Sequence, residues 1–318
     1  MTLSRRAFGL GALTAPVAAS LLTTPAVAEA HASADGAALY GLPIGRYRMT
    51  AILDGIAPLG RAFFFGEDAA AIDAAAAEAG IGPDVLPAPV SAYLLQSEDR
   101  TVLIDAGMGG VDILGPGFGR LSAGLTAAGV AAEAVDAVIV THLHPDHVGG
   151  LLAGQGAAFP NAEIIVAEAE AQFWTDAAMR AAAPAEAQGL FDLAAGVLAA
   201  YEGRVTRVSD GAEVLPGVIL TLSPGHTPGH GVLRIDGGDR QLMMIADTVH
   251  SADLHTALPE TGFGFDTDPA QAAASRIALF DQVSTDKMLV AGSHIHFPGF
   301  GRILKDGAAY RFAPATWL

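Results

Sequence analysis

The chain has 318 residues, 51% of them hydrophobic, and carries a formal net charge of −17 from 34 acidic and 17 basic residues. Such an acidic surface repels polyanions and no cluster of lysine and arginine offsets it, so nucleic acid is excluded as the expected partner. The sequence contains no cysteine, so the protein has neither disulfides nor thiolate metal ligands, and its stability has to come from an apolar core and bound ions.

The first thirty residues are expected to direct export. Arg5 and Arg6 precede a mildly apolar stretch that reaches Leu22 and is followed by small residues typical of a cleavage site. A membrane anchor is the alternative, but a spanning helix needs about 20 strongly apolar residues, and this stretch is shorter and interrupted by Pro16. We therefore predict a twin-arginine signal over residues 1–30, its cleavage, no stable membrane insertion afterwards, and a periplasmic or secreted protein.

After this segment, apolar stretches of strand and helix length alternate. Periodicity and turn residues predict strands over residues 47–53, 90–96, 101–105, 137–140, 163–167, 218–223, 232–235, 241–246 and 287–291. They predict helices over residues 69–79, 121–128, 167–175, 185–200 and 269–280. Because candidate ligands run from His142 to His294, the chain has to close on one site, and residues 31–318 are expected to form a single domain.

One short run concentrates four side chains that bind metals, namely His142, His144, Asp146 and His147. His142 and His144 follow a predicted buried strand and are two residues apart, so their side chains point the same way and can grip one ion together. Pro145 ends the strand, and the adjacent Asp146 and His147 begin the next element and suit a second ion beside the first.

Three further candidates lie far downstream, at His226, Asp247 and His294. Any one histidine alone is more simply an ordinary core or surface residue. Four ligand-type residues within six positions are different, because without a cation they are costly to bury together. The seven residues can hold two divalent ions. Imidazole and carboxylate donors without thiolate favour Zn²⁺, with Mn²⁺, Co²⁺ and Fe²⁺ as alternatives.

In these residues the sequence resembles the metallo-β-lactamase fold. The likeness rests on the HxHxDH run, the run Ser-Pro-Gly-His-Thr-Pro-Gly-His over residues 223–230, Asp247 after an apolar strand, and His294, and it covers roughly residues 45–315. It implies an α/β fold, a four-layer αββα sandwich with the metals at one edge. It also implies one ion on His142, His144 and His226, the other on Asp146, His147 and His294, and a bridging Asp247.

The ligand types distinguish branches of this fold. The absence of cysteine excludes β-lactamases that use a thiolate ligand. Flavin-linked di-iron members carry Glu at the position of His144 and need a flavodoxin domain, for which the chain has no room. A bridging Asp247 is typical of the lactonase, thioesterase and organophosphate-hydrolase branch, and within it the sequence is most similar to methyl parathion hydrolase and lactonase-like members.

The expected mechanism uses two ions that share one water. They lower the pKa of that water from 15.7 toward about 7, so a bridging hydroxide is the expected nucleophile, oriented by Asp247. His250 replaces a tyrosine that contacts the substrate carbonyl in lactonases of this fold, and it is expected either to donate a hydrogen bond to the substrate or leaving group, or to line the pocket wall. Asp105 and His230 are expected to orient ligands through hydrogen bonds.

The substrate pocket is expected to be aromatic. By resemblance to methyl parathion hydrolase, Phe118, Trp174 and Phe191 would lie above the metals, although core packing is the simpler role for Phe191. The three phenylalanines at 63–65 cannot all face one side of an extended segment, so at least one is expected to meet a cleft, a partner subunit or solvent, and Phe64 is assigned to the pocket.

The expected function is a dinuclear metal-dependent hydrolase of small neutral apolar esters and lactones, with phosphotriesters as a side activity. Transition states of both classes place negative charge on an oxygen near the metals, so one site can serve both. A glyoxalase-type thioesterase, for which Arg302, Lys305 and Arg311 could hold an acidic thioester, and a thiolate-free β-lactamase are the alternatives. A non-enzymatic metal-binding scaffold is less favoured, and a homodimer is implied by resemblance.

Replacing both Arg5 and Arg6 by lysine should retain the precursor in the cytoplasm, because the predicted export route reads the arginine pair and not its charge alone. Immunoblots of periplasmic and cytoplasmic fractions check this against the unaltered chain. Undiminished periplasmic protein in the variant would contradict the predicted signal.

Overall fold

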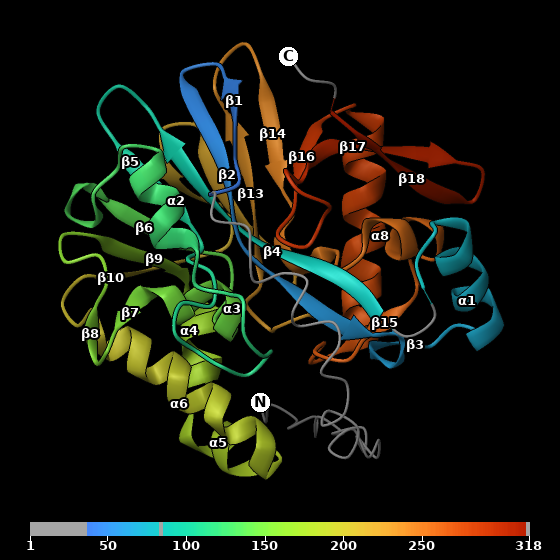
Figure 1. Ribbon diagram of the computed structural model, residues 1–318, viewed down its shortest axis with the longest axis horizontal. Helices are drawn as coiled ribbons and strands as arrows, with labels where there is room; N and C mark the ends of the chain where they lie inside the picture. The colour runs from blue at the N-terminus through green and yellow to red at the C-terminus, as the bar shows by residue number, and fades with distance from the viewer. Residues whose placement is uncertain (1–36, 83–84, 316–318) are drawn as a thin grey trace, which may run out of the picture. The chain divides into compact units, whose positions relative to one another are not determined.

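Two seven-stranded β-sheets form the centre of the computed structural model, which describes residues 37–82 and 85–315 (Figure 1). These described residues fall in one compact unit. The predicted export signal at residues 1–30, with Arg5 and Arg6, lies outside the described residues. Among the helices of the described ranges, none combines the length and apolar character that a membrane span needs.

The first sheet has the strand order β1-β2-β4-β5-β6-β9-β10, in which β5, β6, β9 and β10 run parallel. Strand β6 reads as an unbroken apolar run because all four of its residues are buried between the two layers that cover the sheet. The strands of this sheet are β1 (Leu39–Ile44), β2 (Tyr47–Gly60), β4 (Val85–Gln96), β5 (Thr101–Ile104), β6 (Ala137–Val140), β9 (Glu163–Ala167) and β10 (Val205–Val208).

The second sheet has the order β11-β12-β13-β14-β16-β17-β18, and only β14 and β16 pair in parallel within it. Its strands are β11 (Ala212–Leu215), β12 (Val218–Leu222), β13 (Gly231–Asp236), β14 (Gln241–Met244), β16 (Leu289–Ala291), β17 (Phe300–Asp306) and β18 (Ala309–Pro314). Two small ribbons complete the strands: β3 (Phe64–Phe65) with β15 (Gly262–Phe263), and β7 (Leu152–Ala153) with β8 (Gly156–Ala157).

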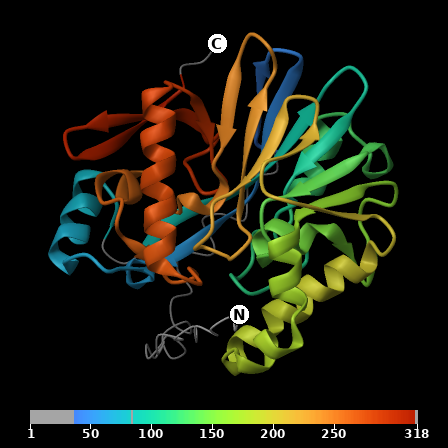
Figure 2. The ribbon, with the colours of Figure 1, turned by 180° about the vertical axis from the view of Figure 1, so that it is seen from behind.

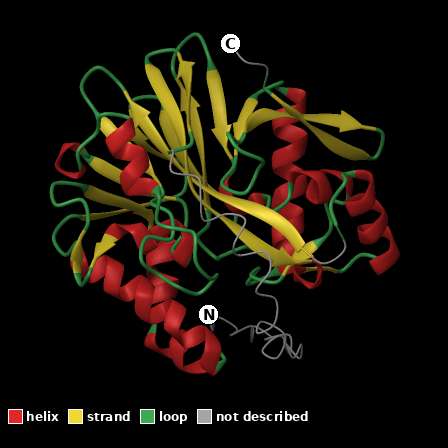
Figure 3. Cartoon of the chain, in the orientation of Figure 1, coloured by secondary structure: helices red, strands yellow, loops and turns green. Residues whose placement is uncertain are grey.

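The sheets pack face to face, and helices cover their outer faces (Figure 3). Between the sheets, Met49 and Ile139 of the first share a core with Leu220 and Met244 of the second. The helices are α1 (Ala69–Glu78), α2 (Leu121–Ala127), α3 (Pro145–Val148), α4 (Glu168–Thr175), α5 (Ala177–Ala182), α6 (Ala185–Ala200), α7 (Ala252–Ala257) and α8 (Pro269–Thr285).

Helices α2, α4 and α6 pack on the first sheet, and α8 lies along the second, as Figure 2 shows from behind. In the described part of the chain, short 3₁₀ turns connect the elements: η2 (Arg61–Phe63), η3 (Ala132–Ala134), η4 (Gly149–Leu151) and η5 (Ala246–Thr248). The arrangement is an αββα sandwich, so the fold class expected from the sequence is confirmed.

The predicted elements differ from the observed ones mainly at their ends. Strand β14 stops at Met244 rather than at residue 246, because Ala246 adopts a left-handed φ of 42° that no strand accommodates. Helix α8 continues five residues beyond the predicted end to Thr285, because Val283 extends its buried stripe. The strands that were not predicted are β1, β3, β7, β8, β10, β11, β15, β17 and β18. Strands β2 and β4 run longer than expected and reach toward α1 (Figure 1).

Replacing Phe280 by alanine should destabilise the protein by about 3–5 kcal/mol, because its fully buried ring fills the space between α8 and the second sheet. The exposed Gln282 on the same helix provides the matched control, since its replacement by alanine should change stability by less than about 0.5 kcal/mol. Denaturant unfolding followed by circular dichroism measures both. Equal effects of the two changes would contradict this account of the core.

Candidate metal centre

The candidate ligands meet where several strands end at one edge of the sandwich. Asp105 follows β5 and His142 follows β6, and these two parallel strands point their carboxyl ends in the same direction. Asp247 and His294 follow the parallel pair β14 and β16 in the same manner. His226 lies in the turn between β12 and β13. Carboxyl ends of parallel strands are a common place for binding sites, because backbone there turns away from the sheet and frees its side chains.

The HxHxDH run folds as its spacing predicts. Pro145 occupies the first turn of α3, a position that needs no backbone N–H, and Asp146 and His147 follow it on that helix. Gly149 and Gly150 then pass so close to the preceding loop that a Cβ would lie 2.1 Å from Met108 O and 1.9 Å from Ala106 O, respectively. Any larger residue would push the loop away from the ligands.

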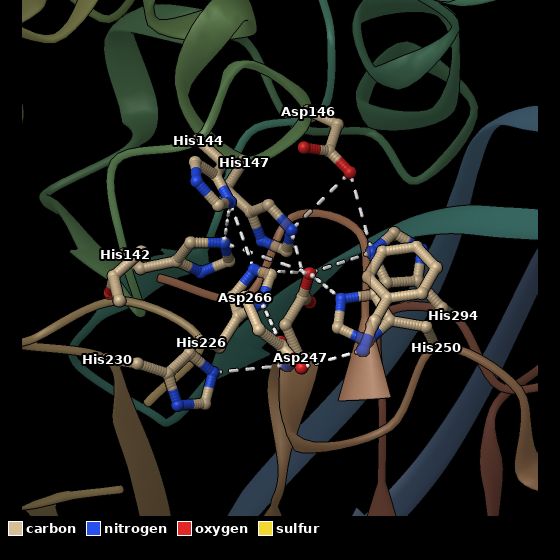
Figure 4. A network of polar contacts seen from close by, with 12 residues as sticks. His142, His144, Asp146, His147, His226, His230, Asp247, His250, Asp266 and His294 are labelled. Atoms are coloured by element: carbon tan, nitrogen blue, oxygen red, sulfur yellow. Dashed lines mark hydrogen bonds and ion pairs between the residues drawn. The ribbon is translucent and has the colours of Figure 1, made fainter. Parts of the chain in front are cut away.

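Three histidine nitrogens converge in a first cluster. His142 Nε2 lies 3.1 Å from His144 Nδ1, which lies 2.9 Å from His226 Nε2. All three rings are buried, and Figure 4 shows their nitrogens pointing at one another. These three are the residues assigned to the first ion by resemblance.

A second cluster joins Asp146, His147, Asp247 and His294. His294 Nε2 is 3.0 Å from Asp247 Oδ2 and 3.4 Å from Asp146 Oδ2. His147 Nε2 is 3.2 Å from Asp247 Oδ1. The Asp146 side chain is the most exposed of the four, at 17%, so this side of the centre faces solvent.

Asp247 lies between the two clusters. Its Oδ2 is also 3.5 Å from His226 Nε2 and 3.7 Å from His142 Nε2, while both of its oxygens face residues of the second cluster (Figure 4). A carboxylate so placed can offer oxygen to both groups, as a bridging ligand does.

Hydrogen bonds on the outer ring atoms orient the histidines. The Nδ1–H of His147 donates to Asp105 Oδ2 at 2.8 Å, that of His226 to Asp266 Oδ1 at 2.9 Å, and that of His294 to the Pro89 carbonyl at 2.8 Å. With a proton fixed at Nδ1, the Nε2 atom of each ring faces the centre and is the atom left to bind a metal. This is the arrangement that protein metal sites use.

The charges of the centre also fit cations. Burial lowers the pKa of His144 and His226 to about 3, so both rings are neutral and offer lone pairs. Burial opposes protonation of His147 as well, but the carboxylates of Asp247 and Asp146 outweigh it and raise its pKa well above the usual range. Two buried carboxylates thus require positive charge beside them.

Two buried polar atoms without a hydrogen-bond partner also support a metal site. His147 Nε2 and Asp247 Oδ1 are buried and face each other without the geometry of a hydrogen bond. Nitrogen and oxygen donors without sulfur suit Zn²⁺ first among the common divalent metals. The residues present therefore fit two divalent ions, one on each cluster, as far as their donor atoms, charges and distances are concerned.

Asp105 and His230 occupy the supporting positions expected for them. Asp105 has a left-handed φ of 59° and accepts hydrogen bonds from the Thr141 N–H, the Thr141 hydroxyl and His147. His230 donates from Nδ1 to the Ser223 carbonyl, and its Nε2 accepts the backbone N–H of Asp247 at 3.1 Å. Both residues contact candidate ligands, and their role in orienting these ligands stays a prediction.

Two buried acids in the centre were not predicted. Asp266 orients His226, and Glu170 accepts hydrogen bonds from both ligand loops. Neither belongs to a recognisable motif. The only sequence signal for Glu170 is a charged residue four positions before Trp174 within a helix that packs on the core.

His250 lies in the wall of the site. Its ring is 2% exposed, stacks on Phe263 with centroids 3.8 Å apart, and places Nε2 3.2 Å from Asp247 Oδ2. Together with His294 and His296 it lines a small hollow, whose apolar side is formed by Ile81 and Leu86. Of the two expected roles, this position favours the wall; donation to a substrate remains a prediction.

The predicted aromatic pocket is only partly formed by the expected residues. Trp174 lies edge-on to His144, with ring centroids 5.4 Å apart. Phe118 is half-buried and covers Gly55. Phe191 and Phe64 need correction, because they are 5% and 1% exposed and pack in the core, Phe191 behind Trp174 and Phe64 against Phe263.

An aromatic residue that was not predicted takes a more open position. Phe265 is 41% exposed, its ring centroid lies 6.5 Å from that of His144, and it packs against Phe63 at 5.2 Å. The rings of Trp174 and Phe265 therefore both lie beside His144 of the first cluster.

Comparison with known proteins assigns the family. The chain belongs to the metallo-beta-lactamase superfamily, whose family model matches residues 85–294 and so includes all seven candidate ligands. The family resemblance seen in the sequence is confirmed.

Several relatives and similar structures are hydrolases. An N-acyl homoserine lactonase of Bacillus sp. is 28% identical over 230 residues, which are 66% of this chain and 83% of that protein. The structure of the hydrolase AbOPH of the beta lactamase superfamily has 29% identity and a TM-score of 0.83, covering 89% of this chain and 99% of its own. AidC, a dizinc quorum-quenching lactonase, covers the same shares with 24% identity and a TM-score of 0.81, and shows the shared fold.

Replacing Asp105 by asparagine should weaken binding of one Zn²⁺ by about 10- to 100-fold, because the amide cannot accept the His147 proton as the carboxylate does. Zn²⁺ titration of chelator-stripped protein measures the effect. The matched control is Asp136→Asn, since Asp136 accepts the Thr101 N–H at the opposite end of β5 and contacts no ligand. Unchanged Zn²⁺ affinity in the Asp105 variant would show that this bond does not support the centre.

Proposed function

We propose that the protein is a dinuclear metal-dependent hydrolase of small neutral esters, with lactones as the foremost substrates. The observation that carries the proposal is the position of Asp247 between two separate groups of buried ligands. A single ion needs no such bridge. We also propose that the protein is exported, as predicted from its first thirty residues.

Two divalent ions bound there would supply a water nucleophile at neutral pH and positive charge for the oxygen that becomes negative in the transition state. The residues of the chain provide the rest. His230 holds the backbone of Asp247, and Asp105 and Asp266 hold the rings of His147 and His226. Since these side chains are buried and hydrogen-bonded, the centre is arranged before a substrate arrives. Such preorganisation is the main source of electrostatic catalysis.

The substrate class is supported by the surroundings of the centre and by the relatives. The exposed ring of Phe265 beside His144 suits an apolar acyl or aryl group, while Trp174 is buried and backs His144 from the core; the acidic chain disfavours anionic substrates. N-acyl homoserine lactonases among the relatives point to lactones. Phosphotriester hydrolysis is the second activity that we propose, because its transition state places charge on an oxygen in the same way.

The alternative enzymes receive less support. Of the basic residues considered for an acidic thioester, Lys305 is already paired with Asp281 at 2.9 Å and with the Tyr310 hydroxyl at 3.0 Å. A thiolate-free β-lactamase is compatible with the same ligands, and a homodimer remains a prediction from resemblance.

Removing the metal should abolish hydrolysis of lactones and aryl esters, and Zn²⁺ should restore it, because the nucleophile depends on the ions. The measurement is turnover across lactones, aryl esters, phosphotriesters, thioesters and β-lactams before and after chelation. We expect the highest kcat/KM on a lactone, and no turnover when His144 and Asp247 are both replaced by alanine. Activity that survives chelation, or a thioester or β-lactam as the best substrate, would refute the proposal.

A further inference from the structure

Glu170 is a fully buried carboxylate in the first turn of α4 that plays no part in the two ligand clusters. It accepts four hydrogen bonds. Oε1 takes the Leu143 N–H at 2.8 Å and the Trp174 indole N–H at 2.7 Å. Oε2 takes the Thr227 hydroxyl at 2.6 Å and the Gly229 N–H at 3.0 Å.

Three of these donors come from the two loops that supply the first cluster. Leu143 lies between His142 and His144, and Thr227 follows His226 directly. The loops are more than eighty residues apart in sequence, yet a single carboxylate binds one with each oxygen. The fourth donor, Trp174, contacts His144 with its ring edge, so Glu170 also fixes the side chain that packs on this ligand.

The loop after His226 packs tightly against helix α4. A Cβ on Gly229 would lie 2.1 Å from the backbone nitrogen of Glu170 and 2.5 Å from its Cα. The loop after His226 thus runs directly against the helix backbone. The need for this contact accounts for the glycine before His230.

The chemistry of the donors requires a charged acceptor. Burial raises the pKa of Glu170, while its hydrogen bonds oppose the rise. Three of the four partners are N–H groups, which only donate, so both carboxylate oxygens have to accept. A glutamine of the same shape would turn an NH₂ group toward at least one N–H. The interaction therefore depends on the carboxylate and not on side-chain volume alone.

We propose that Glu170 is a positioning residue that fixes the separation of the two ligand loops, and thereby the geometry in which His142, His144 and His226 bind one ion. The inference rests on the two-metal centre proposed above. It assigns Glu170 to one ion only, because its donors lie beside His142, His144 and His226, and none of them is next to His294, Asp247 or His147 in the chain.

The test is Zn²⁺ titration of the full chain carrying Glu170→Gln, after chelator treatment and against a competing coloured chelator. Wild type should show two binding steps. In the variant one step should weaken by about 10- to 100-fold and the other should stay unchanged. His144→Ala and His294→Ala identify the steps, and the weakened step should be the one lost in His144→Ala.

Asp54→Asn is the matched control. Asp54 is an equally buried carboxylate that accepts the backbone N–H groups of Met108, Gly119 and Leu121 and touches no candidate ligand. Its replacement should lower the midpoint of thermal unfolding and leave both Zn²⁺ steps in place. Should Glu170→Gln fail to fold, Thr227→Val removes one of the four donors and should weaken the same step by a smaller factor.

Each result separates the two proposals. If wild type binds two ions and Glu170→Gln binds both with unchanged affinity, or loses both equally, the role of Glu170 is overturned and the two-metal centre stands. If wild type binds fewer than two ions, the two-metal centre fails and this inference falls with it. Selective loss of the step that His144 supports establishes the role.

Discussion

The fold places histidine nitrogens and aspartate carboxylates close together in the buried candidate metal centre. The lone pairs and negative charges of these groups repel one another unless a positive charge lies between them. Asp247 has oxygens within 3.7 Å of five histidine nitrogens, and its surroundings are almost closed to water. Burying such a group costs free energy that hydrogen bonds within the cluster cannot recover. The apolar core that joins the two sheets and their helices stabilises the fold enough to offset this unfavourable free energy.

Around this centre, three carboxylates outside the candidate ligand set accept hydrogen bonds from the ligand histidines or from the loops that carry them. Asp105 and Asp266 each hold the outer nitrogen of a ligand histidine, and Glu170 holds the backbone beside two others. Each connects segments that are distant in sequence. Rigid support of this kind matters for catalysis, because donors oriented in advance need no reorganisation when charge develops on the substrate.

The family and the substrate depend on different parts of the molecule. The sandwich and the ligand run define the superfamily, whose members share a fold but differ in chemistry. The substrate is decided by the walls, where Phe265 stands near His144 and the rings of Phe64 and Phe191 are withdrawn into the core. The aromatic content alone could not distinguish these cases, since a ring packs equally well in a core and in a pocket.

The sequence by itself determined what short-range geometry controls. The spacing of His142, His144, Asp146 and His147 defined the ligands, and apolar periodicity located β6, β9 and α6 with their observed bounds. Only the tertiary structure decided that Glu170 and Asp266 support these ligands and that Phe191 is core. The ligand segments that Glu170 and Asp266 hold lie between 27 and 59 positions away from them, and the aromatic partners of Phe191 lie on another helix; contacts across such separations leave no periodicity in the chain.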